Sequence, residues 1–424
     1  MLPDHFPTPE DMSHLRWEAE PNCYRPDYAR ALSTVFPTIY SLLGHPPDDR
    51  PNMAELLPAA VPRRVKRVFV LCVDSMGFKE MAYSPWFSEH YKAFGTWVSS
   101  VFPSITSCAL SSLYQGLPPA RHGILGHLVW KDFPGGVVDM LKMQVVGARS
   151  SLVQSGFQVN QWKREPGLLE TPLSAEVPGM NLMPFPIVRS GLSTYSYGNT
   201  RMVGFAQPVE GFTKASQILQ DIDHGWVGLY LDMVDSLSHV ITHDAPQFGI
   251  TVRFIEDCVR WLASSLPADV AEETLFLMIA DHGQDVIQEM LTLDGEHGEW
   301  LRSHTRGLGF SGRVMHVYLN GAANGRAVKD GLTSLMGDRG RIYDFADAAP
   351  LVGAAPDDAW ARQTLGDQVA ILHEGFCWEN LEFGRPRGPY DTRLLSQHGG
   401  MTWDEMFVPM LTAPMSELAA TARD

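Results

Sequence analysis

Residues 68–74 read VFVLCVD, an uninterrupted apolar run that ends in an aspartate. A run without polar alternation predicts a strand that is buried on both faces, as in parallel sheets. Similar runs occupy residues 227–233, 274–280 and 368–372, and residues 248–266 between the second and third have a helical pattern. This alternation of strands and helices predicts an α/β layered domain.

Three aspartates lie at or just after the ends of these predicted strands, namely Asp74, Asp235 and Asp281. In parallel sheets, functional side chains gather just beyond the carboxyl ends of the strands. We therefore expect the three carboxylates to share one site.

The chain has 424 residues, which exceeds the usual size of one compact domain, so a core with one sizeable insertion is expected. The proline-rich residues 1–61 predict an N-terminal extension. Short half-exposed strands and one helical stretch predict an inserted α+β cap at residues 301–367. Residues 62–300 and 368–424 then form the predicted metal-binding α/β core.

Composition excludes several classes of protein. The 49 acidic and 33 basic residues give a formal charge of -16, which argues against a nucleic-acid-binding surface. The five cysteines are scattered and lack CxxC pairing, so the sequence predicts neither a disulfide framework nor a thiolate zinc site, and it favours a cytoplasmic location. No apolar run is long enough to predict a signal peptide or a membrane span, and nothing indicates the oligomeric state.

Thr106 is the candidate nucleophile. It follows Pro103 at a predicted helix start, where backbone N–H groups and the positive end of the helix dipole stabilise a phosphate or an alkoxide. A simple helix-capping role is the alternative interpretation of this residue alone.

Three further motifs contain candidate metal ligands. Asp235 and His239 are four residues apart, a spacing that puts both on one helix face, although such pairs also occur on solvated helices. Asp281 and His282 follow an apolar strand directly and precede a glycine, and two ionisable groups there are costly unless paired or coordinated. His398 precedes two glycines, and it becomes a candidate metal ligand only because the other motifs accompany it.

Together and in this order, the motifs resemble the alkaline phosphatase superfamily, and specifically its type I phosphodiesterase and nucleotide pyrophosphatase family. The resemblance extends over roughly residues 65–411 and rests on the motifs VLCVDSMG, the threonine ten residues before Gly116, PPARHGI, the Asp–His pair, DHG and HGG. It implies a three-layer α/β/α sandwich of the alkaline phosphatase type with a small inserted α+β cap.

The resemblance also implies two divalent metal ions and their ligands. One metal is expected on Asp235, His239 and His398, and the other on Asp74, Thr106, Asp281 and His282. Zinc is the family's usual metal, and this set of oxygen and nitrogen ligands also accepts manganese or iron. Thr106 would attack phosphorus to form a phosphothreonine intermediate.

The implied substrate is a small phosphate ester, most simply a phosphodiester or a pyrophosphate. This chain has Ser107, Cys108 and Ala109 where the family usually has Phe-Pro-Asn after the nucleophile, so Asn199 and Arg201 in the segment SYGNTR are weak candidates for a polar substrate contact. A phosphomonoesterase, a phosphonate hydrolase, a phosphosugar mutase and a catalytically silent binding protein remain alternatives. A sulfatase is disfavoured because Cys108 lacks the sequence context of a sulfatase nucleophile.

Overall fold

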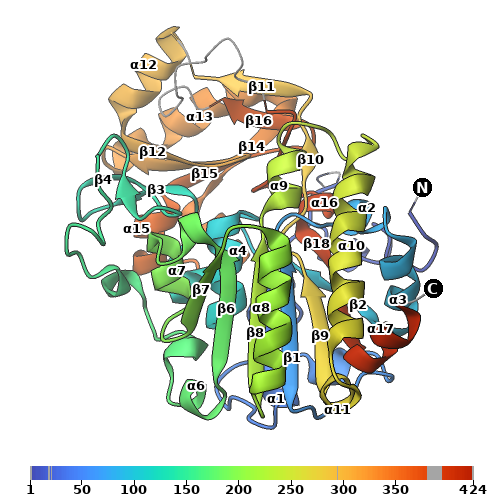
Figure 1. Ribbon diagram of the computed structural model, residues 1–424. Coiled ribbons are helices and arrows are strands. Elements are labelled where there is room, and N and C mark those ends of the chain that lie inside the picture. Colours follow the sequence, from blue (N-terminus) through green and yellow to red (C-terminus); the bar gives the residue numbers. More distant parts are fainter. Residues whose placement is uncertain (1, 18–19, 21, 294, 380–393, 423–424) are drawn as a thin grey trace.

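The computed structural model describes residues 2–17, 20, 22–293, 295–379 and 394–422. The strands of this part of the chain form two large sheets of seven strands each and two small sheets of two strands. Figure 1 shows the first large sheet in the lower half of the molecule, with helices on both faces, and the second sheet above it.

The first sheet has the strand order β2-β18-β9-β1-β8-β6-β7. Its strands are β1 (Arg67–Val73), β2 (Gly95–Ser99), β6 (Gly179–Pro184), β7 (Arg201–Phe205), β8 (Gly225–Leu231), β9 (Thr274–Ile279) and β18 (Phe407–Pro414). The central strand β1 pairs in parallel with β8 and β9, and every residue of these three strands is buried. This confirms the prediction of parallel strands that are covered on both faces.

Helices cover the two faces of this sheet. The main ones are α1 (Val35–Leu42), α4 (Thr106–Gln115), α8 (Pro208–Asp221) and α10 (Gln247–Ser265). None of the described helices combines the length and the apolar character that crossing a membrane requires.

Two aromatic contacts show that the sheet lies between two helical layers. Phe212 of α8 packs on Phe69 of β1, whereas Phe36 of α1 packs on Trp226 of β8. In the pairing register Trp226 is opposite Val68, the neighbour of Phe69. Because side chains alternate along a strand, Phe69 and Trp226 project from opposite faces. The predicted three-layer α/β/α sandwich is therefore confirmed.

The second sheet has the order β14-β15-β13-β12-β3-β4-β5. Its strands are β3 (Leu128–Lys131), β4 (Gly136–Asp139), β5 (Gln144–Val145), β12 (Thr305–Ser311), β13 (Val314–Leu319), β14 (Gly340–Asp344) and β15 (Gln368–Leu372). β15 is antiparallel to β13 and β14, so the apolar run at residues 368–372 lies outside the first sheet. A short buried run does not reveal whether its strand belongs to a parallel or an antiparallel sheet.

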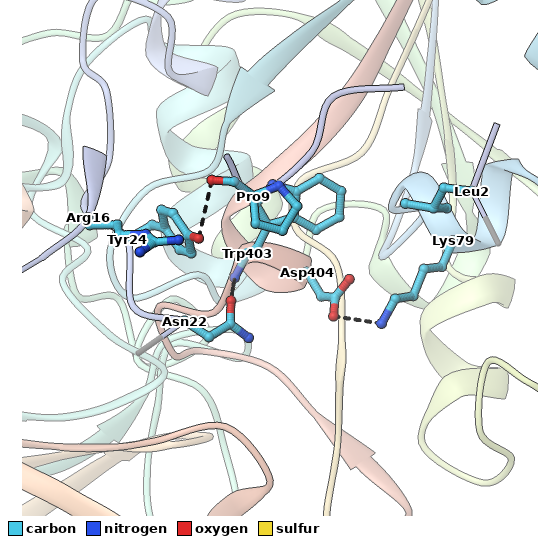
Figure 2. Close-up of a pocket in the computed structure, with 8 residues that line it drawn as sticks. All are labelled: Leu2, Pro9, Arg16, Asn22, Tyr24, Lys79, Trp403 and Asp404. Atoms are coloured by element: carbon cyan, nitrogen blue, oxygen red, sulfur yellow. Dashed lines mark hydrogen bonds and ion pairs between the residues drawn. The ribbon is translucent and has the colours of Figure 1, made fainter. Parts of the chain in front are cut away.

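The division into an extension, a core and a cap stays a proposal. The strand pairings favour drawing the cap from three segments, at residues 128–145, 305–344 and 368–372. The N-terminal segment contacts the loop before β18, where Tyr24 N–H donates to Met401 O at 2.7 Å. Figure 2 shows a second contact, from Trp403 N–H to Asn22 Oδ1, beside a hollow of about 390 Å³.

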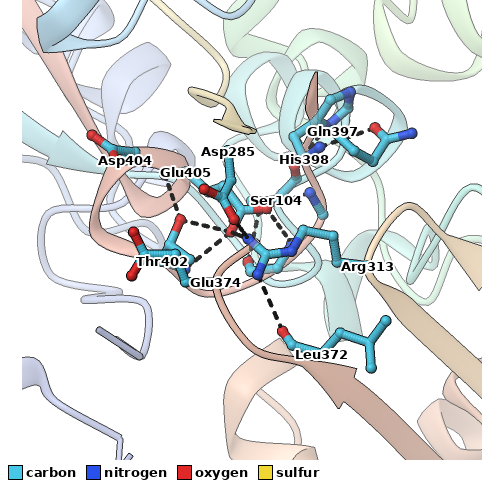
Figure 3. A network of polar contacts seen from close by, with 12 residues as sticks. Ser104, Asp285, Arg313, Leu372, Glu374, Gln397, His398, Thr402, Asp404 and Glu405 are labelled. Carbon is cyan, nitrogen blue, oxygen red and sulfur yellow. Dashed lines mark hydrogen bonds and ion pairs between the residues drawn. The ribbon is translucent and has the colours of Figure 1, made fainter. Parts of the chain in front are cut away.

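Arg313, in the turn between β12 and β13, ties the second sheet to the first (Figure 3). Its guanidinium lies 2.6 Å from Asp285 Oδ2 and 2.7 Å from Glu405 Oε2, and its Nε donates to Phe376 O at 2.9 Å. The side chain is only 1% exposed. A buried cation between two carboxylates is stable only while all of its partners are present.

We expect Arg313→Met to lower the free energy of unfolding by roughly 3–5 kcal/mol, because it leaves the carboxylates of Asp285 and Glu405 buried without their cation. Urea unfolding followed by circular dichroism measures the loss. The matched control is Arg326→Met, whose guanidinium is 94% exposed and which should stay within about 0.5 kcal/mol of wild type. Equal stabilities of the two variants would contradict the assigned role of Arg313.

Candidate metal centre

The loops at the carboxyl end of the first sheet bring all seven predicted site residues together. Asp74 follows β1, Asp235 lies in α9 (Met233–Ser238) after β8, and Asp281 and His282 follow β9. Gly283 allows a close approach there, because a Cβ on it would lie 2.0 Å from Asp404 O.

His282 is the centre of one half of the site. Its Nε2 lies 3.1 Å from Thr106 Oγ1, 3.4 Å from Asp74 Oδ1 and 3.4 Å from Asp281 Oδ2. Thr106 is the first residue of α4 and follows extended backbone at Ile105, so its hydroxyl is at the positive end of the helix. The predicted helix start at Thr106 is therefore confirmed.

Asp235 is the centre of the other half. Its Oδ2 lies 3.5 Å from His239 Nε2, and its Oδ1 lies 3.6 Å from His398 Nε2. The imidazole of His398 stacks on that of His282 at a ring-centroid distance of 3.7 Å, which joins the two halves. Ligand atoms of Asp74, Asp235 and His282 also lie within 4.8 Å of one another, so Asp235 faces both halves.

The three histidines share one orientation. In each of them Nδ1 lies within hydrogen-bond distance of a backbone carbonyl oxygen. The pairs are His239 with Ser396 at 3.0 Å, His282 with Gly283 at 3.1 Å and His398 with Ser104 at 3.0 Å. Because a carbonyl only accepts, Nδ1 carries the proton and Nε2 presents a lone pair to the site. This is the usual arrangement of histidine ligands to a metal.

The distances between ligand atoms also fit a metal. Lone pairs on Nε2 face carboxylate oxygens at 3.4 to 3.6 Å, which is too long for a hydrogen bond. Ligands about 2.1 Å from a tetrahedral cation lie roughly 3.4 Å from one another. A cation between these atoms would satisfy both kinds of lone pair.

Two carboxylate oxygens have no other partner. Asp74 Oδ1 and Asp281 Oδ2 are buried and accept no hydrogen bond within the described part of the chain. Burial, together with the charges of Asp281 and Asp235, raises the pKa of Asp74 well above its ordinary value. The residues present therefore fit divalent cations.

Two contacts in the site were not predicted from the sequence. Tyr230 donates its hydroxyl to Asp74 Oδ2, and Gln284 donates Nε2–H to Asp235 Oδ1 at 2.7 Å. The sequence offered only two signals for these contacts: Tyr230 lies near the end of an apolar strand, and Gln284 directly follows the DHG motif. Tyr230 leaves Asp74 Oδ1 facing His282, whereas Gln284 binds the Asp235 oxygen that faces His398 and leaves Oδ2 facing His239.

The network of Figure 3 extends from Arg313 to the loop that carries His398. Glu405 Oε1 accepts from Gly400 N at 2.8 Å, and Ser104 Oγ donates to Gly400 O at 2.8 Å. The carbonyl of Ser104 in turn accepts from His398 Nδ1. Side chains from the second sheet and from α16 (Trp403–Met406) thus hold this histidine in place.

The weak substrate-contact candidates lie on the edge strand of the sheet and the turn before it. Arg201 begins β7, and the register through β6 and β8 places it level with Phe69, five residues before Asp74 on β1. Asn199 donates its backbone N–H to Leu169 O at 3.3 Å. Their role in substrate binding stays a prediction.

The comparisons with known proteins agree with this geometry. The family model for type I phosphodiesterase / nucleotide pyrophosphatase matches residues 68–343. A search of curated proteins finds no match. Because the family model matches more than half of the chain, the resemblance predicted from the motifs is confirmed.

Several solved structures have a similar fold. Murine ectonucleotide pyrophosphatase / phosphodiesterase 5 is 16% identical with a TM-score of 0.60, covering 83% of this chain and 93% of its own, and an inactive variant of it was solved with AMP. The human protein is 16% identical with a TM-score of 0.62, covering 83% and 92%. Phosphonoacetate hydrolase from Sinorhizobium meliloti, solved with phosphonoacetate, is 16% identical with a TM-score of 0.58, covering 86% and 99%.

We expect Asp235→Asn to lower the amount of bound zinc more than His239→Ala or Asp74→Asn does, because this carboxylate belongs to both groups of possible ligand atoms. His239→Ala and Asp74→Asn should each give a smaller loss, because each of these side chains belongs to one group. Metal analysis after gel filtration in zinc measures the stoichiometry. In wild type, zinc at 100 times its Kd should also raise the free energy of unfolding by about 2.7 kcal/mol.

The matched control for these variants is His297→Ala, on an exposed position of α12 (Gly295–His304). It should keep the wild-type metal content. An Asp235→Asn protein with full metal content would show that these atoms do not hold the ions.

Proposed function

Because the chain belongs to the type I phosphodiesterase / nucleotide pyrophosphatase family, we propose that this phosphoester hydrolase is a two-metal phosphodiesterase that works through a phosphothreonine on Thr106. The observation that supports the proposal most directly is the position of Thr106 Oγ1, at a helix start and 3.1 Å from His282 Nε2. Asp74 Oδ1 and Asp281 Oδ2 accept no hydrogen bond from the described residues, and each lies 3.4 Å from the same nitrogen, His282 Nε2.

Seven side chains would hold the two cations. Asp235, His239 and His398 would hold one, and Asp74, Thr106, Asp281 and His282 the other. We propose zinc, because imidazole and carboxylate ligands at these spacings suit it, and manganese or iron is the alternative. When bound, divalent cations lower the pKa of a coordinated hydroxyl and neutralise charge on the phosphoryl oxygens.

The start of α4 positions the nucleophilic oxygen of Thr106 and stabilises charge near it. The hydroxyl of Thr106 projects from the first turn of α4, whose N–H groups and dipole stabilise negative charge on the oxygen and on a phosphoryl group near it. Thr106 Oγ1 loses its proton and forms a bond to phosphorus, while the bond between phosphorus and the leaving oxygen breaks and that oxygen takes up a proton. The oxygen of a water molecule then attacks phosphorus from the vacated side, the P–Oγ1 bond breaks, and a proton of that water returns to Oγ1.

The neighbouring Cys108 does not suit a nucleophile. It lies in the first turn of α4, is fully buried, and has a pKa that burial raises well above the ordinary thiol value. A thiolate is the reactive form, so this position favours the threonine chemistry over a sulfatase. For location we propose the cytoplasm, on the strength of the scattered cysteine pattern in the sequence.

The substrate class is proposed as a small phosphodiester or pyrophosphate. Complexes of the similar structures contain AMP in one case and phosphonoacetate in another, so a nucleotide-derived ester and a phosphonate are the two ligand types to compare. The acidic composition, with 49 acidic and 33 basic residues, does not favour a polymeric nucleic acid.

We expect Thr106→Ala to lower the turnover of an aryl phosphodiester by at least about 10³-fold, because the nucleophilic oxygen is gone while most metal ligands remain. A chromogenic diester assay measures the rate, and metal analysis should show that the variant keeps most of its metal. The matched control is Thr213→Ala on α8, which should keep the wild-type rate. A wild-type rate in Thr106→Ala would refute the nucleophile.

We also expect the zinc-loaded protein to hydrolyse diesters faster than monoesters or phosphonates at equal concentration. Acid quenching during turnover, followed by peptide mass spectrometry, should find the phosphoryl group on Thr106. A preference for monoesters would indicate a phosphomonoesterase, and cleavage of a carbon–phosphorus bond would indicate a phosphonate hydrolase. Transfer of phosphate within a sugar, with no release, would indicate a mutase.

A further inference from the structure

A second hollow lies outside the metal centre and is lined by residues of β3 and the turn after it, of the segment at residues 157–162 and of α15 (Ala359–Leu365). Figure 1 shows β3 and α15 close together on the left of the molecule. Its volume is about 270 Å³, and none of the seven candidate metal-centre residues lines it. Four aromatic side chains, one lysine, one aspartate and three neutral polar side chains line it. They are Phe133, Phe157, Trp162, Trp360, Lys131, Asp132, Gln161, Gln363 and Thr364.

Lys131 is buried at a position that the strand pattern reserves for an apolar side chain. Along β3, Val129 and Lys131 point inward while Leu128 and Trp130 are partly exposed. Lys131 is only 6% exposed, and its ammonium donates to Gly123 O at 3.3 Å and to Thr364 Oγ1 at 3.0 Å. Burial lowers its pKa to about 7.

The neighbouring cations differ from Lys131 because each has a carboxylate partner. These pairs are Lys163 with Glu170, Arg164 with Asp358 and Arg121 with Glu165. Within the described ranges Lys131 forms no such ion pair, and both of its hydrogen-bond acceptors are neutral. The adjacent Asp132 also lines the hollow, but its Oδ1 pairs with Arg306 Nη1 at 3.4 Å and accepts a hydrogen bond from Trp130 Nε1 at 3.0 Å. A buried ammonium without a counter-charge is costly.

The aromatic side chains form a connected wall. Phe133 and Phe157 have ring centroids 5.1 Å apart, and Phe157 and Trp162 are 5.0 Å apart. The Lys131 ammonium lies 5.0 Å from the Trp162 ring, so the charge is next to this wall. Phe133 is 63% exposed, which is unusual for a phenylalanine that has two aromatic neighbours to pack on.

We propose that this hollow binds a small aromatic carboxylate. The carboxylate would give Lys131 its missing counter-charge, and the ring would lie against the wall of Phe133, Phe157 and Trp162. This inference does not depend on the proposed hydrolase activity, because it uses none of the metal-centre residues.

Size and charge favour a carboxylate over a phosphate. A volume of about 270 Å³ is at the lower end for ligand pockets and has room for roughly one ring with a short substituent. One ammonium balances one negative charge. A phosphate dianion would bring a second negative charge, whereas the residues that line the hollow include one cation, Lys131, and already one carboxylate, Asp132.

Benzoate is the test ligand, and benzamide is its neutral control. Isothermal titration of the full zinc-loaded protein should show saturable benzoate binding and at least tenfold weaker benzamide binding. Lys131→Met should weaken benzoate binding roughly 10- to 100-fold, as expected for the loss of a charged hydrogen bond. Phe133→Ala, at an exposed position, keeps the lysine and should also weaken binding. The matched control Phe185→Ala, another exposed phenylalanine (57%), should bind benzoate like wild type.

Activity separates this site from the metal centre. Benzoate should not compete with an aryl phosphodiester, and Thr106→Ala should bind benzoate like wild type. The proposal is overturned if benzoate shows no saturable binding, or if it binds Lys131→Met and Phe133→Ala as tightly as wild type. It is equally overturned if benzoate competes with the diester, since the ligand would then occupy the metal centre.

Discussion

The constraint on which the structure depends is the accumulation of buried lone pairs at the carboxyl end of one sheet. Asp74 and Asp281 each keep an oxygen that accepts nothing within the described residues, and His282 directs an unprotonated nitrogen at both. Negative charge and lone pairs at such distances repel one another in a medium of low dielectric constant. Folding the chain around this cluster therefore requires either protonation, as the raised pKa of Asp74 indicates, or cations.

The surrounding structure holds these groups in place despite their repulsion. Backbone carbonyls fix the Nδ1 atoms of the three histidines, and Tyr230 and Gln284 each hold one carboxylate. A further restraint comes from the second sheet, because Arg313 binds Asp285 and Glu405, which lie in the segments that follow His282 and His398. The second sheet thus does more than cover the site. It supplies the cation that keeps two ligand loops together, so the metal centre and the contact between the sheets depend on each other.

The sequence predicted the parts of this arrangement that depend on local pattern. A buried strand followed by an aspartate is visible within seven residues, so Asp74 and Asp281 were found, and the four-residue spacing of Asp235 and His239 needs only a helix. The supporting contacts were not found because their partners are distant in the chain. Arg313 and Glu405 are 92 residues apart, and nothing local in either segment marks them as a pair. The strand at residues 368–372 was placed in the wrong sheet for a similar reason, since apolar character alone does not specify a pairing partner.

The metal centre and the hollow at Lys131 follow from the same physical rule, that a buried charged group needs a partner of opposite charge, and the two sites differ in the sign of that charge. At the metal centre, buried oxygens lack hydrogen-bond donors, and the missing partner is a cation. At Lys131, a buried ammonium has neutral acceptors where its neighbouring cations have carboxylates, and the missing partner is an anion. An apolar side chain at either place would make the free energy of folding more favourable, because unpaired buried charge is among the most destabilising features of a protein interior. The aromatic wall beside Lys131 would pack against a ring on that anion, just as the start of α4 would stabilise a phosphoryl group at the metal centre.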